Sequence, residues 1–241
     1  MSATTAQLRP RATVRVATLP GVFRPRSDAL LLAAAMRERG LARGAAVLDL
    51  FTGSGVIAVA AALEGARSVT AVDLSRRAVL TARLNALRNG VGRRVRTLRG
   101  DLFAPLGDER FDLLTANPPY LPGAAEPPRG AARAWEGGSD GRLLVDRLCA
   151  GARERLAPGG TLLLVQSSLT GERETLERLA AGGLDARVTI RRRGPLGPLA
   201  RERADELRAL GRLAPGSDEE ELLVIEASAP PLARAPQEPP R

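Results

Sequence analysis

AAVLDLFTGSGVIA, residues 45–58, is the stretch that decides the fold. Its first half is a short apolar run containing the acid Asp49, which is typical of a buried parallel strand. Its second half holds Gly53 and Gly55, which permit a tight turn and let a ligand come close to the backbone. Ala58 then completes a G-x-G-x-x-A pattern. The stretch therefore predicts a strand, a ligand-binding turn and a helix in succession.

The rest of the chain alternates between strand-like and helix-like segments. Strands are predicted at 45–50, 68–73, 95–98, 111–116, 161–166, 184–191 and 221–227, and helices at 28–39, 56–64, 75–89, 140–156, 172–181 and 199–210. This alternation favours a doubly wound α/β sheet, mostly parallel, in one domain over residues 13–228. The polar segment 1–12 and the Pro-rich segment 229–241 are predicted to be disordered tails.

The composition excludes several kinds of chemistry. Of the 241 residues 44% are hydrophobic but only 2% aromatic, so we expect a core of Ala, Leu and Val. The absence of His removes the commonest catalytic base and metal ligand, and a single cysteine, Cys149, excludes internal disulfides and thiolate clusters. We expect no metal site and a core position for Cys149. No apolar run is long enough to span a bilayer and we read no signal peptide, so a cytoplasmic protein without membrane contact is expected.

The formal net charge of +9 favours an anionic partner such as RNA. The run Arg191–Arg193, with Arg201 and Arg203, could contact RNA phosphates or an acidic protein. A solvated charged surface is the alternative interpretation. The scarcity of aromatic residues leaves few side chains to stack on unpaired bases.

The glycine turn indicates a nucleoside-containing ligand. Asp73 follows Gly55 by eighteen residues, at the end of the second predicted strand, where an acid can hold a pair of ribose hydroxyls. These features fit NAD and S-adenosylmethionine equally well. Asp49 distinguishes them, because its carboxylate would repel a pyrophosphate but attract the amino group of a methionine moiety. A turn that serves packing alone remains the alternative.

A second motif, Asn117-Pro-Pro-Tyr120, follows the strand predicted at 111–116. The two prolines fix the backbone and have no N–H, while Asn117 offers a carbonyl and an amide. Tyr120 adds an aromatic face on which a flat group can stack. Together they suit a planar nitrogen, in a carboxamide or an exocyclic base amine, whose N–H groups need acceptors. Catalysis there would rest on positioning and electrostatics rather than on a strong base.

With Gly100-Asp-Leu-Phe103, these motifs resemble those of class I S-adenosylmethionine-dependent N-methyltransferases, and most closely the release factor glutamine methyltransferase family. The opening Gly21-Val-Phe-Arg-Pro-Arg-Ser-Asp28 resembles a short form of that family without its helical N-terminal domain. The segment Trp135-Glu-Gly-Gly-Ser-Asp-Gly141 is similar to the family's substrate-side segment. The resemblance implies a Rossmann-like methyltransferase fold, a seven-stranded and mostly parallel sheet with helices on both faces.

The resemblance also implies roles for individual residues. The implied cofactor-binding residues are Ser27, Asp49, Phe51, Thr52, Gly53, Ser54, Gly55, Asp73, Asp101, Leu102 and Asn117, and the implied catalytic residues are Asn117, Pro118, Pro119 and Tyr120. The turn would contact the methionine part, Asp73 the ribose, and Asp101 with Leu102 the adenine. Ser27 and Asp28 would close over the cofactor. Phe51 departs from the family, which often has glycine at this position.

The implied reaction is methyl transfer to the glutamine N5 of the Gly-Gly-Gln loop of a peptide-chain release factor, and a small activating subunit is a possible partner. One alternative is methylation of an exocyclic amine such as adenine N6 in RNA or DNA, since both nitrogens are planar and conjugated. A duplex-DNA enzyme must flip the base, and no separate recognition domain is visible for that. The second alternative is a non-catalytic module that binds S-adenosylmethionine or RNA. Trp135 is interpreted either as part of a lid or a substrate wall, or as part of a surface loop.

Overall fold

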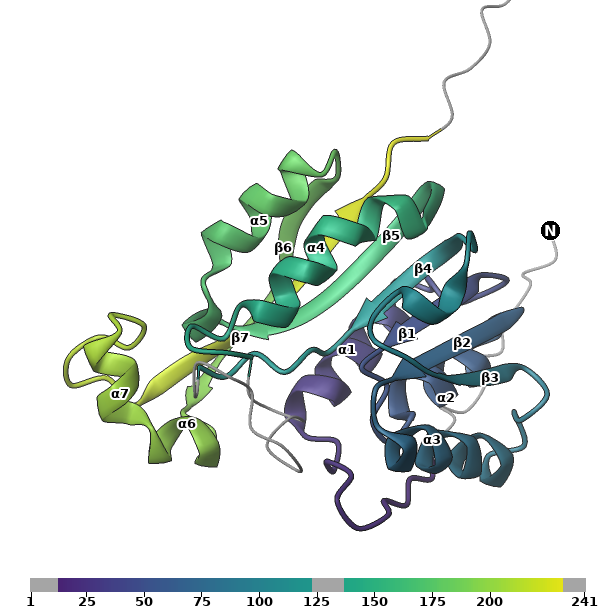
Figure 1. Ribbon diagram of the computed structural model, residues 1–241, viewed down its shortest axis with the longest axis horizontal. Coiled ribbons are helices and arrows are strands. Elements are labelled where there is room, and N and C mark those ends of the chain that lie inside the picture. The colour runs from purple at the N-terminus through teal and green to yellow at the C-terminus, as the bar shows by residue number, and fades with distance from the viewer. Residues whose placement is uncertain (1–12, 123–136, 232–241) are drawn as a thin grey trace, which may run out of the picture.

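Seven strands form one sheet in the order β3-β2-β1-β4-β5-β7-β6. The computed structural model describes residues 13–122 and 137–231 (Figure 1). The strands are β1 (Ala46–Leu50), β2 (Ser68–Asp73), β3 (Val95–Arg99), β4 (Phe111–Ala116), β5 (Leu156–Ser167), β6 (Asp185–Pro195) and β7 (Glu219–Ser228). The pairs among β1 to β5 are parallel, and β7 is antiparallel to both β5 and β6. The predicted mostly parallel sheet is confirmed.

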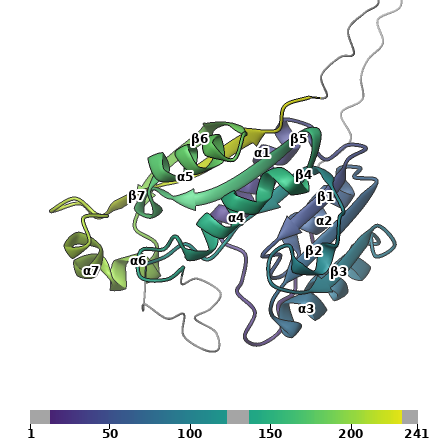
Figure 2. The ribbon, with the colours of Figure 1, turned by 45° about the horizontal axis from the view of Figure 1, so that its top comes forward.

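Helices cover both faces of the sheet (Figures 1 and 2). They are α1 (Ser27–Glu38), α2 (Val56–Leu63), α3 (Arg76–Arg88), α4 (Leu143–Arg155), α5 (Glu172–Ala181), α6 (Pro198–Glu202) and α7 (Ala204–Ala209). Residues of α1, α2 and α3 share one apolar cluster with Val47 and Leu113, while α4 and α5 share another with Leu48 and Leu114. Successive strand residues point to opposite faces, so one strand supplies both clusters.

Small side chains make the core close-packed without many aromatic rings. In α2 seven of the eight residues are buried, and the helix reads VIAVAAAL. Alanine allows a helix to approach a sheet closely, so this helix sits directly behind the glycine turn that precedes it. The buried apolar residues are mostly Ala, Leu and Val, as the composition predicts.

The two sequence motifs begin side by side in the sheet. From β1 the chain proceeds to β2 and β3 on one side, and it returns to β4 on the other. The register places Leu50, which precedes the glycine turn, beside Ala116, which precedes Asn117. In a doubly wound sheet this point of reversal is where a crevice opens at the carboxyl ends of the strands.

One helix prediction is wrong. The segment 199–210 forms two short helices, α6 and α7, separated by Arg203, which has φ −115° and ψ 17°. The break lets Ala200 and Leu207 join one small apolar cluster with Leu121. The guanidinium of Arg203 also donates a hydrogen bond of 2.7 Å to the carbonyl of Pro122. Tertiary contacts here outweigh local helix propensity.

Several element boundaries also differ from the predictions. The helix predicted from residue 140 begins at Leu143, after Gly141 with its positive φ of 76°. Strand β5 begins directly after α4, where Leu156 pairs with Phe111 ahead of a register shift. Ala229, predicted to lie in a tail, is 3% exposed and donates to the carbonyl of Gly160. Pro230 and Pro231 are exposed and belong to no helix or strand, and residues 1–12 and 232–241 of the predicted tails lie outside the described residues.

Candidate active site

Three residues with positive φ shape the turn after β1. Phe51, Gly53 and Gly55 have φ values of 56°, 53° and 78°. A Cβ at Gly55 would lie 2.8 Å from the Cα of Ala82, so glycine is what lets α3 approach the turn. Phe51 adopts the left-handed conformation with a side chain, at a cost of about 1 kcal/mol. Glycine would adopt it freely, which explains why glycine suits this position in the family that the sequence resembles.

Asp49 lies behind the turn rather than in the cavity. Its carboxylate is fully buried and accepts hydrogen bonds from the hydroxyls of Thr52, at 2.5 Å, and Thr115, at 2.8 Å. Burial is the main reason that its pKa rises to about 6, and the two threonine hydroxyls oppose that rise. Asp49 does not line the cavity, so the expected direct contact with a cofactor amino group is not what this geometry offers. The carboxylate instead joins the turn to β4.

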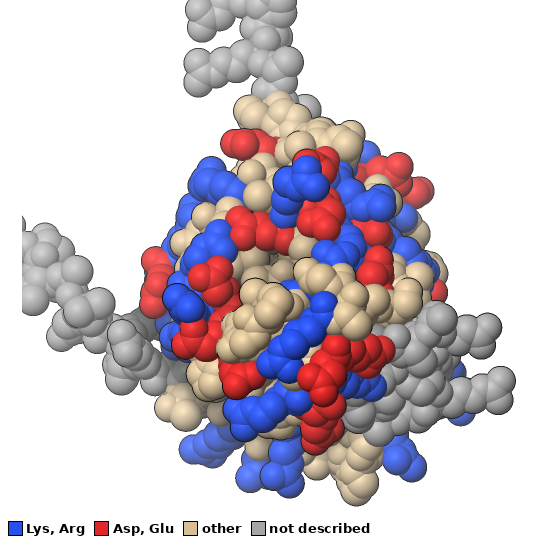
Figure 3. All heavy atoms as spheres, turned by 90° about the vertical axis from the view of Figure 1, so that its left-hand side faces the viewer, with Lys and Arg blue, Asp and Glu red and all other residues tan. Residues whose placement is uncertain are grey.

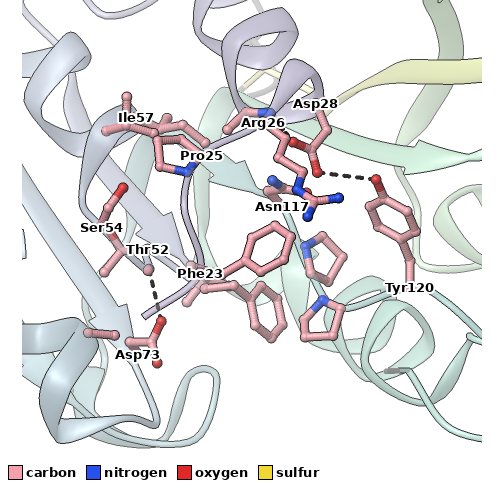
Figure 4. Close-up of a pocket in the computed structure, with 18 of the residues that line it drawn as sticks. Phe23, Pro25, Arg26, Asp28, Thr52, Ser54, Ile57, Asp73, Asn117 and Tyr120 are labelled. Atoms are coloured by element: carbon pink, nitrogen blue, oxygen red, sulfur yellow. Dashed lines mark hydrogen bonds between the residues drawn. The ribbon is translucent and has the colours of Figure 1, made fainter. Parts of the chain in front are cut away.

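Asp73 faces the cavity from the end of β2 (Figure 4). One carboxylate oxygen accepts from the backbone N–H of Gly53 at 2.9 Å, and the other accepts from that of Ser75 at 2.8 Å. Burial raises its pKa, while the backbone hydrogen bonds oppose the rise. Each oxygen has a second lone pair, so the carboxylate can still accept hydrogen bonds from a pair of ribose hydroxyls.

Asp101 and Leu102 line the cavity beyond Asp73. Leu102 is buried and has a positive φ of 49°, whereas Asp101 is exposed and forms an ion pair of 2.8 Å with Arg147. The backbone N–H of Gly100 donates to the carbonyl of Asp73, which joins the two carboxyl-end loops. These residues form the wall where the resemblance expects the adenine.

Asn85 in α3 and Asn89, the residue that follows α3, hold the segment 13–26 against the glycine turn. The side chain of Asn85 exchanges hydrogen bonds with the backbone of Ala17, at 3.0 and 2.8 Å, and donates to the carbonyl of Ser54 at 2.8 Å. The side chain of Asn89 exchanges two more with the backbone of Arg15, at 2.9 and 2.7 Å. Asn85 is 1% exposed, so a single buried amide links this segment to the turn.

This asparagine pair was not among the predicted site residues. Asn85 and Asn89 stand four residues apart on one side of the helix predicted at 75–89, although Asn is a poor helix former. A buried amide needs partners, so that spacing could have signalled a segment packed along the helix.

The segment 13–26 also supplies one wall of the cavity. Phe23, Pro25 and Arg26 line it, and the guanidinium of Arg26 lies 4.9 Å from the centroid of the Phe23 ring. Figure 4 places these three side chains between Asp73 on one side and Tyr120 on the other. The wall therefore borders both motifs.

Asn117 brings unused hydrogen-bonding capacity to the cavity. Pro118 and Pro119 are buried and have no N–H, and Asn117 is half-buried. Across residues 13–122 and 137–231, no other group hydrogen-bonds to the side-chain amide of Asn117. Its carbonyl and NH₂ are thus free to serve a molecule in the cavity.

Tyr120 is held by one hydrogen bond at its side-chain hydroxyl and another at its backbone carbonyl. Its hydroxyl donates to the Asp28 carboxylate at 3.2 Å, and its carbonyl accepts from the hydroxyl of Thr170 at 3.0 Å. Burial, followed by the negative charges of Asp28 and Glu220, raises the pKa of Tyr120 well above its usual value. The phenol therefore stays neutral and acts as a wall and a hydrogen-bond donor, not as a base.

A cavity of about 860 Å³ brings most of the predicted site residues together. The predicted residues that line it are Ser27, Phe51, Thr52, Gly53, Ser54, Asp73, Asp101, Leu102, Asn117, Pro118, Pro119 and Tyr120. Asp49 and Gly55 do not line it. Beyond Asn117 the cavity continues along residues that were not predicted, among them Pro195, Leu199 and Leu222. They come from β6, α6 and β7, and nothing local in the sequence connects them to the site.

The cavity fits S-adenosylmethionine. Its volume is within the range of small-molecule sites, roughly 300–1,000 Å³. One end offers the Asp73 carboxylate and the backbone of the turn, and the other offers apolar walls with Asn117. The first end matches the hydroxyls of an adenosine, and Asn117 lines the same cavity.

The arginines that the sequence suggested as an RNA-binding run mostly contact other residues of the same chain. Arg191 pairs with Glu172 and Glu221, and Arg193 pairs with Glu219. Figure 3 shows basic and acidic side chains interleaved over this end of the molecule. The guanidinium of Arg201 donates to the carbonyl of Leu196, and that of Arg203 to Pro122, as noted above. Arg192 lines the cavity instead.

The remaining expectations concern Cys149, a metal site, a membrane span and Trp135. Cys149 is fully buried, and burial raises its pKa to about 12, which confirms a core position. Among residues 13–122 and 137–231 no cluster of acidic or cysteine side chains could hold a metal ion, and none of the helices is long and apolar enough to cross a membrane. Trp135 lies outside the described residues.

Three features define the chain as an S-adenosylmethionine-dependent methyltransferase. They are the doubly wound sheet, the glycine turn with Asp73, and the Asn117 motif. The model of the Methyltransferase small domain family matches residues 13–182. The chain belongs to this family.

Individual relatives are methyltransferases that act on glutamine. One from Methanocaldococcus jannaschii, named as a protein N5-glutamine methyltransferase, is 33% identical over 73% of this chain and 87% of its own length. A release factor glutamine methyltransferase from Gloeobacter violaceus is 42% identical over 66% of this chain. The match spans 57% of that relative's length, so this chain corresponds to little more than half of it.

A solved structure is similar over nearly the whole chain. It is a chain of the E. cuniculi Mtq2–Trm112 complex, described as responsible for methylation of the eRF1 translation termination factor. The TM-score is 0.60 and the sequence identity 25%, with 87% of this chain and 99% of that chain covered.

Proposed function

We propose that this chain transfers a methyl group from S-adenosylmethionine to the side-chain amide nitrogen of a glutamine in a peptide-chain release factor. The observation that carries the proposal is the side-chain amide of Asn117, which lines the cavity beside the buried Pro118 and Pro119 and has no hydrogen-bond partner among residues 13–122 and 137–231. A carboxamide is planar and has two N–H donors, so it complements an acceptor-rich wall. The name of the Gloeobacter violaceus relative gives this substrate, and that of the Methanocaldococcus jannaschii relative gives a glutamine of a protein.

The residues of the site would act by orientation. The carbonyl oxygens of Asn117 and Pro118 would accept hydrogen bonds from the two N–H groups of the substrate amide. These hydrogen bonds would turn the amide nitrogen toward the cofactor. S-adenosylmethionine would supply an electrophilic methyl group on a sulfonium sulfur; the transfer would break the methyl–sulfur bond, form the methyl–nitrogen bond and release one amide proton to solvent. Tyr120 and the prolines would exclude water and keep the amide plane fixed. Because no His is present and Tyr120 stays neutral, the rate enhancement would come from positioning and electrostatics.

Nucleic acid is a weaker candidate as the substrate. An exocyclic amine is also planar, and Tyr120 could stack on a base. The Arg191–Arg193 run, however, is largely paired with glutamates, which removes the main electrostatic argument for RNA at that end. A non-catalytic binding module would have no need of the free Asn117 amide.

The partners and the compartment follow from the substrate. A release factor works with the ribosome, so the proposed place of action is the cytoplasm. A small activating subunit is a further proposed partner, because the similar solved structure is a two-protein complex.

The test is a transfer assay with the purified chain and methyl-labelled S-adenosylmethionine. One sample contains a release factor, a second the same factor with the glutamine of its Gly-Gly-Gln loop changed to alanine, and a third total RNA. The proposal predicts label in the first sample alone. Label that persists in the alanine variant, or that enters RNA, would overturn it. If all three stay unlabelled with a candidate subunit added, the chain is not this enzyme.

A further inference from the structure

Helix α3 carries an apolar stripe on its solvent side. Leu80, Leu84 and Leu87 are 49%, 47% and 60% exposed. They are spaced four and three residues apart, which places them on one face of the helix. The buried residues of α3, among them Ala82 and Asn85, lie on the opposite face. An outward face of a surface helix is ordinarily polar, so this stripe needs an explanation.

The stripe is flanked by arginines without ion-pair partners. Arg76, Arg83 and Arg88 belong to α3, which contains no acidic residue. Within the described part of the chain, none of these three forms an ion pair. The α6–α7 end differs, because there Arg208 and Arg212 are matched with acids. The outer face of α3 therefore combines exposed leucines with flanking arginines, and the helix contributes no acidic side chain to it.

The stripe leads away from the mouth of the cavity. Arg76 and Ala78, in the first turn of α3, line the cavity, and so does Leu74 just before the helix, which is 48% exposed. With a rise of 1.5 Å per residue, Leu87 lies about 16 Å along the axis from Arg76. Figures 1 and 2 both show α3 at the outer margin of the molecule. A protein with one loop in the cavity could thus rest on this helix.

We infer that the outer face of α3 is a docking surface for the protein substrate, and that it fits an acidic patch with an apolar centre. The inference rests on the proposed function, which requires a folded protein to present its glutamine at the cavity. The three leucines would supply apolar contact, and the flanking arginines would set orientation and speed association. A short peptide would fill the cavity without touching this surface.

The experiment compares a whole release factor with a short synthetic peptide that contains its Gly-Gly-Gln loop. The variants are Leu84→Ser and Arg83→Glu in the full chain, with Leu210→Ser as the control. Leu210 is 48% exposed in the α6–α7 region, nearly equal to Leu84, and it does not line the cavity. Neither Leu84 nor Arg83 lines the cavity, so folding and cofactor affinity should be unchanged.

The expected result is a rise of about tenfold in the Kd and KM for the whole factor in both α3 variants. The peptide's kcat/KM should change less than twofold, and Leu210→Ser should resemble the original protein. Three results would contradict the proposed docking surface. They are an unchanged affinity for the factor, an equal loss of affinity in Leu210→Ser, and a comparable loss of kcat/KM with the peptide. A dimer in sedimentation that Leu84→Ser dissociates would also contradict it, as would RNA binding lost in Arg83→Glu while factor binding persists.

The same assay separates the two proposals. If the original protein methylates the peptide while the α3 variants bind the factor normally, only the docking surface fails. If it methylates neither peptide nor factor, the proposed function fails and the docking surface with it.

Discussion

The two halves of the cavity use their polar groups in opposite ways. The carboxylate of Asp73 lines the half formed by the glycine turn, and the Asp49 carboxylate and the Asn85 amide lie behind that turn; all three are engaged by neighbouring groups. In the half formed by the Asn117 motif, the amide of Asn117 has no partner among the described residues. The polar groups of the first half have hydrogen-bond partners before any ligand binds, whereas Asn117 in the second half has none among the described residues.

This difference matches two kinds of ligand. A cofactor is the same molecule in every turnover, so a preorganised site loses little entropy when it binds. The acceptor must be held tightly only as the methyl group moves, so its hydrogen-bonding partners should remain free until then. Changes in the first half should therefore alter cofactor affinity or stability, and changes in the second should alter the rate of transfer.

The largest expected effect is on catalysis. Asn117→Ala should lower the single-turnover rate of methyl transfer by about 10³-fold, because the acceptor amide loses its main orienting group. Asn89→Ala, which removes an asparagine outside the cavity, is the control. A rate within tenfold of the original would show that Asn117 does not orient the acceptor.

The second effect is a pH dependence of stability that arises from Asp49. Its carboxyl releases its proton near pH 3.8 in the unfolded chain but near 6 in the folded protein. Between these values the folded state binds more protons, so the free energy of unfolding falls as the pH rises. Across this window the original protein should lose about 2–3 kcal/mol relative to Asp49→Asn. Urea unfolding at several pH values measures this, and parallel curves for the two proteins would refute it.

The third effect concerns cofactor affinity. Asp73→Ala should raise the Kd for S-adenosylmethionine by about 10- to 100-fold, because the ribose loses a charged acceptor. Asp112→Ala is a matched control, since Asp112 also accepts from a backbone N–H, that of Ala46, and lies outside the cavity. Calorimetric titration gives both values, and an equal loss in the two variants would reduce Asp73 to a structural role.

The smallest effect separates Asn85 of α3 from Asn89, the residue that follows this helix. Asn85→Asp keeps the acceptor for the N–H of Ala17 but loses the donors to the carbonyls of Ala17 and Ser54, so the Kd for S-adenosylmethionine should rise about tenfold. Asn89→Asp loses a contact with the same segment but none with the glycine turn, and its Kd should rise less than about threefold. The ratio of the two Kd values is the measurement. A ratio near one would mean that the segment, rather than its link to the turn, governs affinity.

Features that depend on local sequence were predictable. Strands β2 and β4 have the predicted bounds, and the Asn117 motif stands at the predicted end of β4. Turn glycines, strand patterns and caps act over a few residues, so the sequence displays them directly.

Features that depend on distant partners were not predictable. The direction of the Asp49 carboxylate is set by Thr115, which is 66 residues away along the chain. The hydrogen bond from Asn85 to Ala17 spans 68 residues, and the cavity wall from Pro195 to Leu199 depends on how β6 meets β7. Such contacts appear only once the chain is folded.

The central claim is that the two halves act independently, and titration of S-adenosylmethionine into the Asn117→Ala variant tests it most directly. The predicted Kd lies within about threefold of that of the original protein, even though methyl transfer is lost. A Kd weakened by more than about tenfold would contradict the claim, because Asn117 would then belong to the cofactor site rather than to the acceptor site.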